Sequence, residues 1–138
     1  MPIPDARARF EQARIARLAT MRPDGRPHLV PIVFALQHDL VYSIVDAKPK
    51  RGRDLVRLTN IAAEPRVEML VDHYAEDWQA LWWVRIDGIA TVVETGPHRD
   101  VAIRLLLDKY RQYDDWAAPF GAAIVIQIER WSSWSFSS

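Results

Sequence analysis

The sequence has no cysteine and only five glycines among its 138 residues. The absence of cysteine excludes disulfides, thiolate metal sites and cysteine nucleophiles, and it fits an intracellular protein. No G-x-S-x-G, G-x-x-x-x-G-K-[ST] or G-x-G-x-x-G pattern occurs, so the most recognisable hydrolase, P-loop and dinucleotide-binding signatures are missing. Any redox chemistry would have to come from a bound cofactor.

The sequence also has no excess of charge of either sign and no long apolar run. Lys plus Arg and Asp plus Glu both number 18, which gives a formal net charge of zero and predicts no nucleic-acid partner and no membrane partner. Residues 1–5 lack the pattern of a signal peptide, and no apolar run approaches the roughly 20 residues of a membrane span. We therefore expect a cytoplasmic protein.

Length and hydrophobic pattern predict a single domain, 1–138, because a hydrophobic content of 49% is enough for one core. Strands are expected where apolar residues alternate or cluster between turn residues, at 15–21, 28–36, 40–45, 66–74, 81–94 and 122–128. Helical spacing predicts helices near 5–17, 54–64 and 97–113. Six strands interrupted by single helices do not give a regular βαβ alternation, so we predict an antiparallel barrel with peripheral helices.

The most informative segment places four cations beside a proline and a glycine at a strand end: Lys48, Lys50, Arg51 and Arg53. Arginine forks bind phosphate oxygens in pairs, lysine adds a point charge, and a helix that begins at Asp54 would add free backbone N–H groups. Such a turn suits phosphate. Composition alone also leaves a solvated basic turn open, because most charge runs simply face water.

The histidines and the acidic pairs indicate no further centre. His28 and His73 lie on expected strands, while His38 and His98 lie in polar breaks, and none has the spacing of a zinc ligand set. We therefore predict no metal. The acidic pairs at 76–77 and 114–115 lie beside tryptophan in expected loops, where solvated carboxylates are the simpler interpretation.

Six tryptophans are many for a chain of this length. The adjacent strand residues Trp82 and Trp83 must point to opposite faces of the sheet, because side chains alternate along a strand. One indole can fill the core, and the other would lie on the outer face, where it marks a subunit interface or a planar ligand. Structural packing of both is the alternative.

Several short motifs follow one another in a recognisable order. Segments 15–20, 23–28 and 30–34 read as an A-x-L-A-T strand, a D-G-x-P-H turn and a second strand, and segments 48–55 and 60–67 read as K-x-x-x-L and N-P-R-V motifs. In this order they resemble the pyridoxamine 5′-phosphate oxidase-like flavin and deazaflavin oxidoreductases. The segments 71–74 and 77–88 are similar to the short members that use coenzyme F420. One departure is Ala63-Glu64-Pro65, where the family usually has Asn or Asp before the proline.

The resemblance implies a fold and a site. The fold would be the FMN-binding split β-barrel, six-stranded and antiparallel, in a homodimer with two cofactor sites at the subunit interface. Against the ring of the cofactor the resemblance places Val30, Pro31, Ile32, Val33 and Ser43. At its phosphates it places Lys48, Lys50, Arg51 and Arg53, and from the partner subunit it expects Trp78 or Trp82.

The function that this resemblance implies is an F420-dependent oxidoreductase that transfers a hydride between the reduced deazaflavin and a small conjugated substrate. The four cations favour the long acidic tail of F420 over the single phosphate of FMN, but an FMN-binding oxidoreductase is the near alternative. A non-catalytic flavin-binding carrier is a second class, because no convincing proton donor stands out; Tyr42, Tyr74 and His73 are weak candidates. The protein would supply orientation, exclusion of water and charge complementarity.

Overall fold

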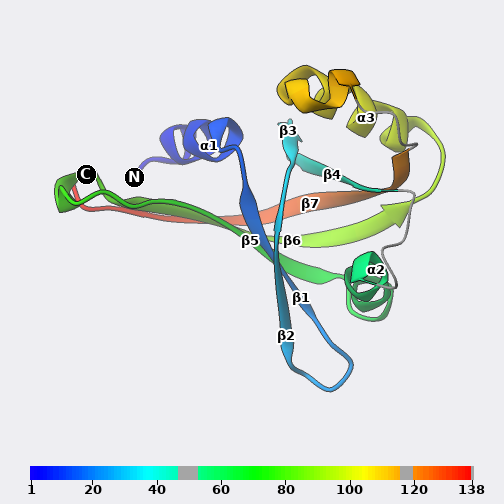
Figure 1. The fold of residues 1–138 in the computed structure, drawn as a ribbon. Coiled ribbons are helices and arrows are strands. Elements are labelled where there is room, and N and C mark those ends of the chain that lie inside the picture. The colour runs from blue at the N-terminus through cyan, green and yellow to red at the C-terminus, as the bar shows by residue number, and fades with distance from the viewer. Residues whose placement is uncertain (47–52, 116–119, 138) are drawn as a thin grey trace.

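Seven antiparallel strands and three helices form the part of the chain that the computed structural model describes, residues 1–46, 53–115 and 120–137 (Figure 1). The strands are β1 (Ala16–Met21), β2 (Pro27–Ile32), β3 (Ala35–Gln37), β4 (Leu40–Asp46), β5 (Arg66–His73), β6 (Trp82–Val93) and β7 (Phe120–Ser135). The helices are α1 (Ile3–Gln12), α2 (Arg53–Ala63) and α3 (Pro97–Lys109), with short 3-10 helices η1 (Trp78–Ala80) and η2 (Arg111–Asp115). One sheet in the order β2-β1-β5-β6-β7-β4-β3 holds all these strands, which confirms the mainly β, antiparallel fold with peripheral helices.

The expected strand 28–36 is two strands, so the described chain has seven strands where six were predicted. β2 pairs with β1 and β3 pairs with β4, at opposite edges of the sheet. Val33 and Phe34 cross between them, and side chains bind their backbone groups: the Ser43 hydroxyl donates to the Val33 carbonyl (2.9 Å), and the Phe34 N–H donates to the Tyr110 hydroxyl (3.1 Å). The apolar run continues through the break, so periodicity alone could not reveal it.

Three element boundaries also differ from the prediction, and one of them is the end of α3 at Lys109 instead of 113. α1 ends at Gln12 instead of continuing to residue 17, because Ala13 already has an extended backbone (ψ 140°) that leads into β1. β7 continues to Ser135 instead of ending near 128, because β6 supplies partners along its whole length, from Val93 opposite Ala123 to Trp82 opposite Ser135. Serines in the second half of β7 hide the strand signal in the sequence.

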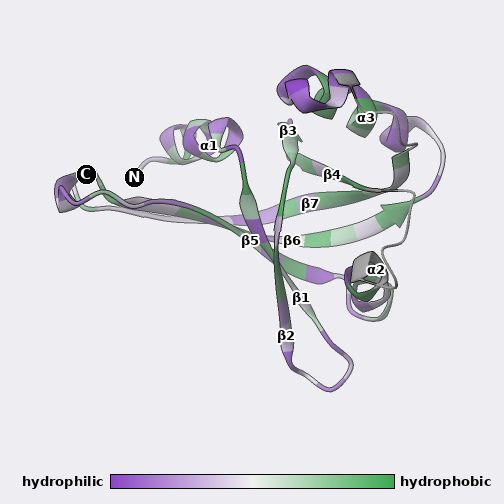
Figure 2. Ribbon diagram, in the orientation of Figure 1, coloured by the Kyte–Doolittle hydropathy of each residue, from purple (hydrophilic) through white to green (hydrophobic). Residues whose placement is uncertain are grey.

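The hydrophobic core has two parts. In the larger part, among α1, α2 and the sheet, the ring of Phe10 lies 5.0 Å from that of Phe34 and 5.5 Å from that of Trp131, measured between centroids. In the smaller part, Ala102 and Leu106 of α3 pack on β3, β4 and β7. Figure 2 shows hydrophobic residues along the strands that α3 covers. α2 and α3 therefore cover different regions of the sheet, and the crossing between β2 and β3 lies near both.

A register shift between β6 and β7 requires a glycine. Asp87 pairs with Arg130 and Gly88 pairs with Ile128, so β7 has an extra residue at this point. A Cβ atom on Gly88 would lie 2.6 Å from the Cγ2 atom of Ile126 and 2.7 Å from the carbonyl oxygen of Gln127. Both distances are shorter than van der Waals contact, so only glycine lets the strands approach this closely at the bulge.

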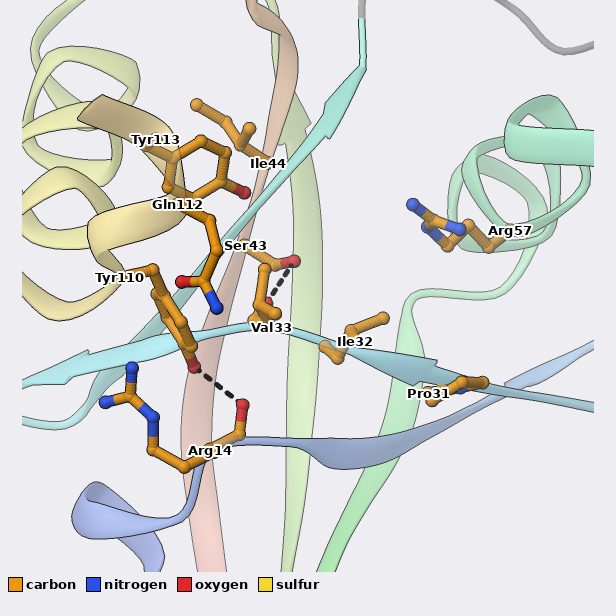
Figure 3. A pocket seen from close by; sticks show the side chains of 10 residues that line it. All are labelled: Arg14, Pro31, Ile32, Val33, Ser43, Ile44, Arg57, Tyr110, Gln112 and Tyr113. Carbon is orange, nitrogen blue, oxygen red and sulfur yellow. Dashed lines mark hydrogen bonds between the residues drawn. The ribbon is translucent and has the colours of Figure 1, made fainter. Parts of the chain in front are cut away.

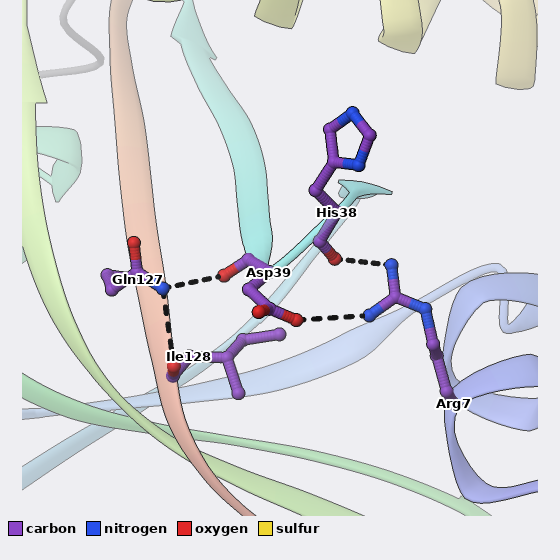
Figure 4. A network of polar contacts seen from close by, with 5 residues as sticks. All are labelled: Arg7, His38, Asp39, Gln127 and Ile128. Carbon is purple, nitrogen blue, oxygen red and sulfur yellow. Dashed lines mark hydrogen bonds and ion pairs between the residues drawn. The ribbon is translucent and has the colours of Figure 1, made fainter. Parts of the chain in front are cut away.

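A polar network joins α1 to the tip of the β3–β4 hairpin and to β7 (Figure 4). The Arg7 guanidinium donates to the His38 carbonyl and lies 3.5 Å from the Asp39 carboxylate. The Asp39 carbonyl accepts a hydrogen bond from the backbone N–H of Ile128 (2.9 Å). His38 has a φ of 55°, in the left-handed region that costs a residue with a Cβ atom about 1–2 kcal/mol. The hairpin tip thus holds α1 by polar contacts as well as by core packing.

Candidate functional site

A cavity of about 480 Å³ lies between the β2–β3 crossing, α2 and the end of α3 (Figure 3). Its volume falls in the usual range for small-molecule sites, roughly 300–1,000 Å³. The lining comes from segments far apart in the sequence, namely Arg14, Pro31, Ile32, Val33, Ser43, Ile44, Arg57, Tyr110, Gln112 and Tyr113. Arg14, Pro31 and Gln112 are exposed, so the rim of the cavity reaches solvent.

The crossing segment gives the cavity an apolar wall. Pro31 has no backbone N–H, Ile32 is buried and Val33 is half-buried. Ser43 on β4 is buried, and its hydroxyl donates to the Val33 carbonyl at 2.9 Å. This hydrogen bond ties the crossing segment to β4, so a flat apolar ligand would meet a surface that is already fixed in place.

Tyr110 forms the wall below α3. Its hydroxyl accepts the Phe34 N–H and lies 3.0 Å from the carbonyl oxygens of both Arg14 and Phe34, to one of which it donates at a time. Burial raises the pKa of Tyr110, against smaller lowering effects of the hydrogen bond to Phe34 and of the Arg14 charge. The hydroxyl therefore stays neutral near pH 7 and holds the crossing segment, α3 and the start of β1 together.

Two cations stand beside Tyr110. The Arg14 guanidinium lies 4.5 Å from the centre of the Tyr110 ring and donates to the Lys109 carbonyl at 2.9 Å. The Lys109 ammonium donates to the Phe34 carbonyl at 2.9 Å and lies 3.9 Å from the centre of the Phe34 ring. Burial, followed by the Arg14 charge, lowers the pKa of Lys109 to about 8, and Glu11 opposes this effect.

The α2 side of the cavity is also basic. Arg57 of α2 lines the cavity, and α2 begins at Arg53. Burial lowers the pKa of His28 on β2, and the guanidiniums of Arg22 and Arg57 lower it further. These effects favour a neutral imidazole at His28.

The cavity brings together four of the five residues predicted to lie near a cofactor ring: Pro31, Ile32, Val33 and Ser43. Val30 packs against the core. Of the cations predicted at the phosphates, Lys48, Lys50 and Arg51 lie outside the described residues, and Arg53 is described only in its backbone as the first residue of α2.

The tryptophans predicted to come from a partner subunit lie at the other end of the sheet. Trp78 on η1 is 60% exposed, whereas Trp82 is half-buried and has the Arg9 guanidinium 5.2 Å from its ring centre. Trp83 instead has Arg85 beside it, at 5.2 Å. The two adjacent indoles thus contact different neighbours, as strand alternation predicts.

None of the three proton-donor candidates lines the cavity. Tyr42 is buried, its hydroxyl lies 3.3 Å from His98 Nδ1, and burial raises its pKa. Tyr74 and His73 are exposed near the end of β5. The cavity therefore contains none of the three candidates. That the site lacks a convincing proton donor stays a prediction.

The sequence prediction missed six lining residues: Arg14, Ile44, Arg57, Tyr110, Gln112 and Tyr113. One signal was available for Arg57, which lies four residues after Arg53 and so on the same face of α2. No local pattern marks Arg14 or Tyr110, because the tertiary contact between α3 and the β2–β3 crossing creates their positions.

Within the ranges that the structure describes, no three His, Cys, Asp or Glu side chains form a group that could hold a metal ion. In the same ranges, no helix is both long and apolar enough to cross a membrane. The predicted absence of a metal and of a nucleic-acid partner, and the single domain, stay predictions.

The comparisons with known proteins establish the family. The family model described as pyridoxamine 5′-phosphate oxidase matches residues 3–135, and the chain therefore belongs to the pyridoxamine 5′-phosphate oxidase family. No curated protein matches the sequence.

Solved structures share the fold at low sequence identity. An FAD-binding protein from Mesorhizobium loti is 20% identical with a TM-score of 0.73, over 96% of this chain and 94% of that chain. The heme storage protein HutZ from Vibrio cholerae is 16% identical with a TM-score of 0.67, over 98% and 95%. An F420 reductase is 23% identical with a TM-score of 0.61, over 88% and 91%. These similarities show that the sheet is the split barrel of this family, and they show the fold alone.

Proposed function

We propose that the chain is an F420-dependent oxidoreductase and that the 480 Å³ cavity holds the deazaflavin ring. The observation that carries this proposal is the meeting of the fixed apolar crossing segment, from Pro31 to Val33, with the basic side of α2 in one cavity. A flat ring suits the first surface and a phosphate suits the second. The family and the F420 reductase among its structural relatives support the same assignment.

In this proposal the residues of the chain bind the cofactor and orient its ring. Pro31, Ile32 and Val33 present apolar surface to the ring, and Ser43 keeps the crossing segment in place through its hydrogen bond to Val33. Arg57 adds positive charge from α2, and the basic segment 48–53, which precedes α2 in the sequence, would hold the phosphates. When bound, reduced F420 supplies the hydride for a small conjugated substrate. The protein contributes orientation and the exclusion of water.

A homodimer belongs to this proposal. The rim of the cavity reaches solvent, so one chain alone does not seal a ligand from water. We propose that a second copy covers the cavity, and the exposure of Trp78 makes it a better closing residue than Trp82, which is half-buried beside Arg9. A cytoplasmic location fits an intracellular redox cofactor.

Two alternative functions are each favoured by an observation: an FMN-binding oxidoreductase and a non-catalytic flavin carrier. FMN would fit the same apolar wall and needs only one phosphate contact. A non-catalytic flavin carrier is favoured by the position of Tyr42, Tyr74 and His73, none of which lines the cavity. Steady turnover of a conjugated acceptor would support the enzyme, whereas tight binding without turnover of any acceptor would support the carrier.

Parallel titrations with F420 and with FMN, followed by cofactor fluorescence, test the proposed function. Charge-assisted hydrogen bonds contribute about 1.5–3 kcal/mol each, so Lys50→Ala and Arg51→Ala should weaken F420 binding about tenfold to a hundredfold. The variants should melt like the wild type without cofactor, since single surface charges usually contribute little to folding.

Arg26→Ala is the matched control, because Arg26 is an exposed cation in the β1–β2 turn whose ion-pair partner, Asp24, is 3.8 Å away. Its cofactor affinity should stay at the wild-type value. If both turn variants also keep that value, the turn is solvated surface. If neither cofactor binds the wild type, the proposed function is wrong.

A further inference from the structure

The side of the cavity away from α2 carries its own cation, which the cofactor proposal does not use. Figure 3 shows Arg57 on one side of the cavity and Arg14, Tyr110 and Gln112 on the other, with Ile32 and Val33 between them. Within the described ranges no ion pair involves Arg14. We refer to Arg14, Gln112 and Tyr113 as the α3 end of the cavity.

Arg14 is held in position before any ligand binds. Its guanidinium lies 4.5 Å from the centre of the Tyr110 ring, and one of its N–H groups donates to the Lys109 carbonyl at 2.9 Å. Tyr110 is itself fixed by its hydrogen bonds to the backbone of Phe34 and Arg14. A guanidinium has five N–H donors, so these contacts leave most of them for a ligand. Little side-chain entropy would be lost on binding.

The charges around the α3 end favour an anion. Lys109 lies close enough to Arg14 for the two charges to repel, which contributes to the lowered pKa of Lys109. Glu11 acts on Lys109 in the opposite direction. A negative group beside Arg14 would relieve this repulsion, so the protein gains electrostatic free energy from an anion at this position.

The donors fit a carboxylate better than a phosphate. The Lys109 ammonium already donates to the Phe34 carbonyl, so Arg14 is the cation that remains for a ligand at the α3 end. A guanidinium fork binds either group through two oxygens, but one guanidinium balances the single charge of a carboxylate and not the charge of about −1.5 to −2 on a phosphate monoester. The carboxamide of Gln112 adds an N–H donor at the same rim.

We propose that the α3 end selects substrates that carry a carboxylate, with Arg14 as the residue that binds it and Gln112 as a second donor. This inference rests on the proposed function, which directs the cofactor phosphates toward α2 and so leaves the opposite side to the substrate. The substrate class is then a small, planar, conjugated acid. The same carboxylate chemistry could come from the acidic tail of F420, and the test separates the two sources.

The test compares cinnamate with its uncharged analogue cinnamamide, with binding followed by NMR titration of the whole chain. The wild type should bind cinnamate at least about tenfold more tightly than cinnamamide, because the charge-assisted fork is lost with the amide. Arg14→Gln should remove this preference and leave cinnamamide binding unchanged. Arg111→Gln is the matched control, since Arg111 is an exposed cation on η2 that does not line the cavity, and it should keep the preference.

Gln112→Leu keeps the test informative if Arg14→Gln fails to fold. The side chain of Gln112 is exposed and makes no hydrogen bond to the described residues. This variant should therefore melt normally and bind cinnamate more weakly. Equal binding of the two probes, or wild-type preference in Arg14→Gln, would overturn the inference.

Repeating the titration with saturating F420, and again with FMN, separates the sources of the carboxylate. Cinnamate should bind together with either cofactor. Competition with F420 but not with FMN would assign Arg14 to the acidic tail and overturn the substrate assignment. If no cofactor binds while the Arg14-dependent preference persists, the proposed function fails and the carboxylate site stands.

Discussion

At the scale of single residues, the close approach of β6 and β7 depends on Gly88. Its position opposite the bulge in β7 brings two backbones together where a Cβ atom would approach Ile126 and the Gln127 carbonyl at less than 3 Å. Ile126 is fully buried in the core, and the carbonyl belongs to the strand and can move only with it. We expect Gly88→Ala to lower the free energy of unfolding by about 1–3 kcal/mol, the usual cost of overpacking.

Urea denaturation measures this loss. Thr91→Ala is the control, because Thr91 is exposed on the same strand and should change the free energy of unfolding by less than about 0.5 kcal/mol. Equal unfolding midpoints for the Gly88 variant and the wild type would show that the two strands are farther apart in solution.

His38 is a second residue whose backbone conformation decides how a substitution changes the free energy of unfolding. Its φ of 55° is unfavourable for any side chain with a Cβ atom, and the network with Arg7 uses its carbonyl group. We expect His38→Gly to raise the free energy of unfolding by about 0.5–1 kcal/mol, after the greater freedom of glycine in the unfolded chain is subtracted. His38→Ala keeps the strain and should not stabilise. A destabilised His38→Gly variant would indicate that the imidazole makes a contact of its own.

At the scale of elements, α3 acts on the crossing between β2 and β3 through Lys109 and Tyr110. The pKa of Lys109 is lowered to about 8 by burial and by Arg14, while the unfolded chain keeps the ordinary value near 10.4. Between these values the unfolded state binds more protons than the folded state, so the free energy of unfolding rises with pH. One proton limits the slope to about 1.4 kcal/mol per pH unit.

Urea denaturation of the wild type and of Lys109→Gln between pH 7.5 and about 9.5 checks this slope. The window stops below pH 10 because burial raises the pKa of Tyr42 and Tyr110, and these two groups lower stability with pH above the ordinary tyrosine value, about 10. The variant should lack the part of the slope that Lys109 contributes. Identical slopes would mean that Lys109 keeps its ordinary pKa in the folded protein.

The same elements show how much of the fold the sequence could predict. Alternation and turn residues were enough for the β1–β2 hairpin, for β5 and for β6, because these strands pair with neighbours close in the chain. The crossing at Val33 and Phe34 could not be predicted, since its backbone groups are bound by Ser43 and Tyr110 from other elements. The family resemblance predicted four residues that line the cavity, namely Pro31, Ile32, Val33 and Ser43. The position of Arg14 in the cavity could be found only from the tertiary structure.

At the scale of the whole molecule, the end of the sheet formed by β5, β6 and β7 extends away from α2 and α3 (Figure 1). Large aromatic side chains lie exposed at this end, namely Tyr74 (64%), Trp78 (60%), Trp134 (41%) and Phe136 (51%). Exposed aromatic clusters of this kind are typical of protein interfaces. We therefore expect a symmetric homodimer in which this end of one copy approaches the cavity of the other.

Sedimentation at micromolar concentration should show the dimer, and Trp78→Ser should weaken it. An interface tryptophan commonly contributes 2 kcal/mol or more, so the dimer dissociation constant should rise about thirtyfold or more. Because the partner would close the cavity, cofactor affinity should fall in the same variant although Trp78 is remote from the cavity of its own chain. Leu107→Ser, which changes an exposed apolar residue on α3, should leave both quantities unchanged. A wild-type monomer that binds cofactor fully would show that one chain completes the site, and the shared-site arrangement would be wrong.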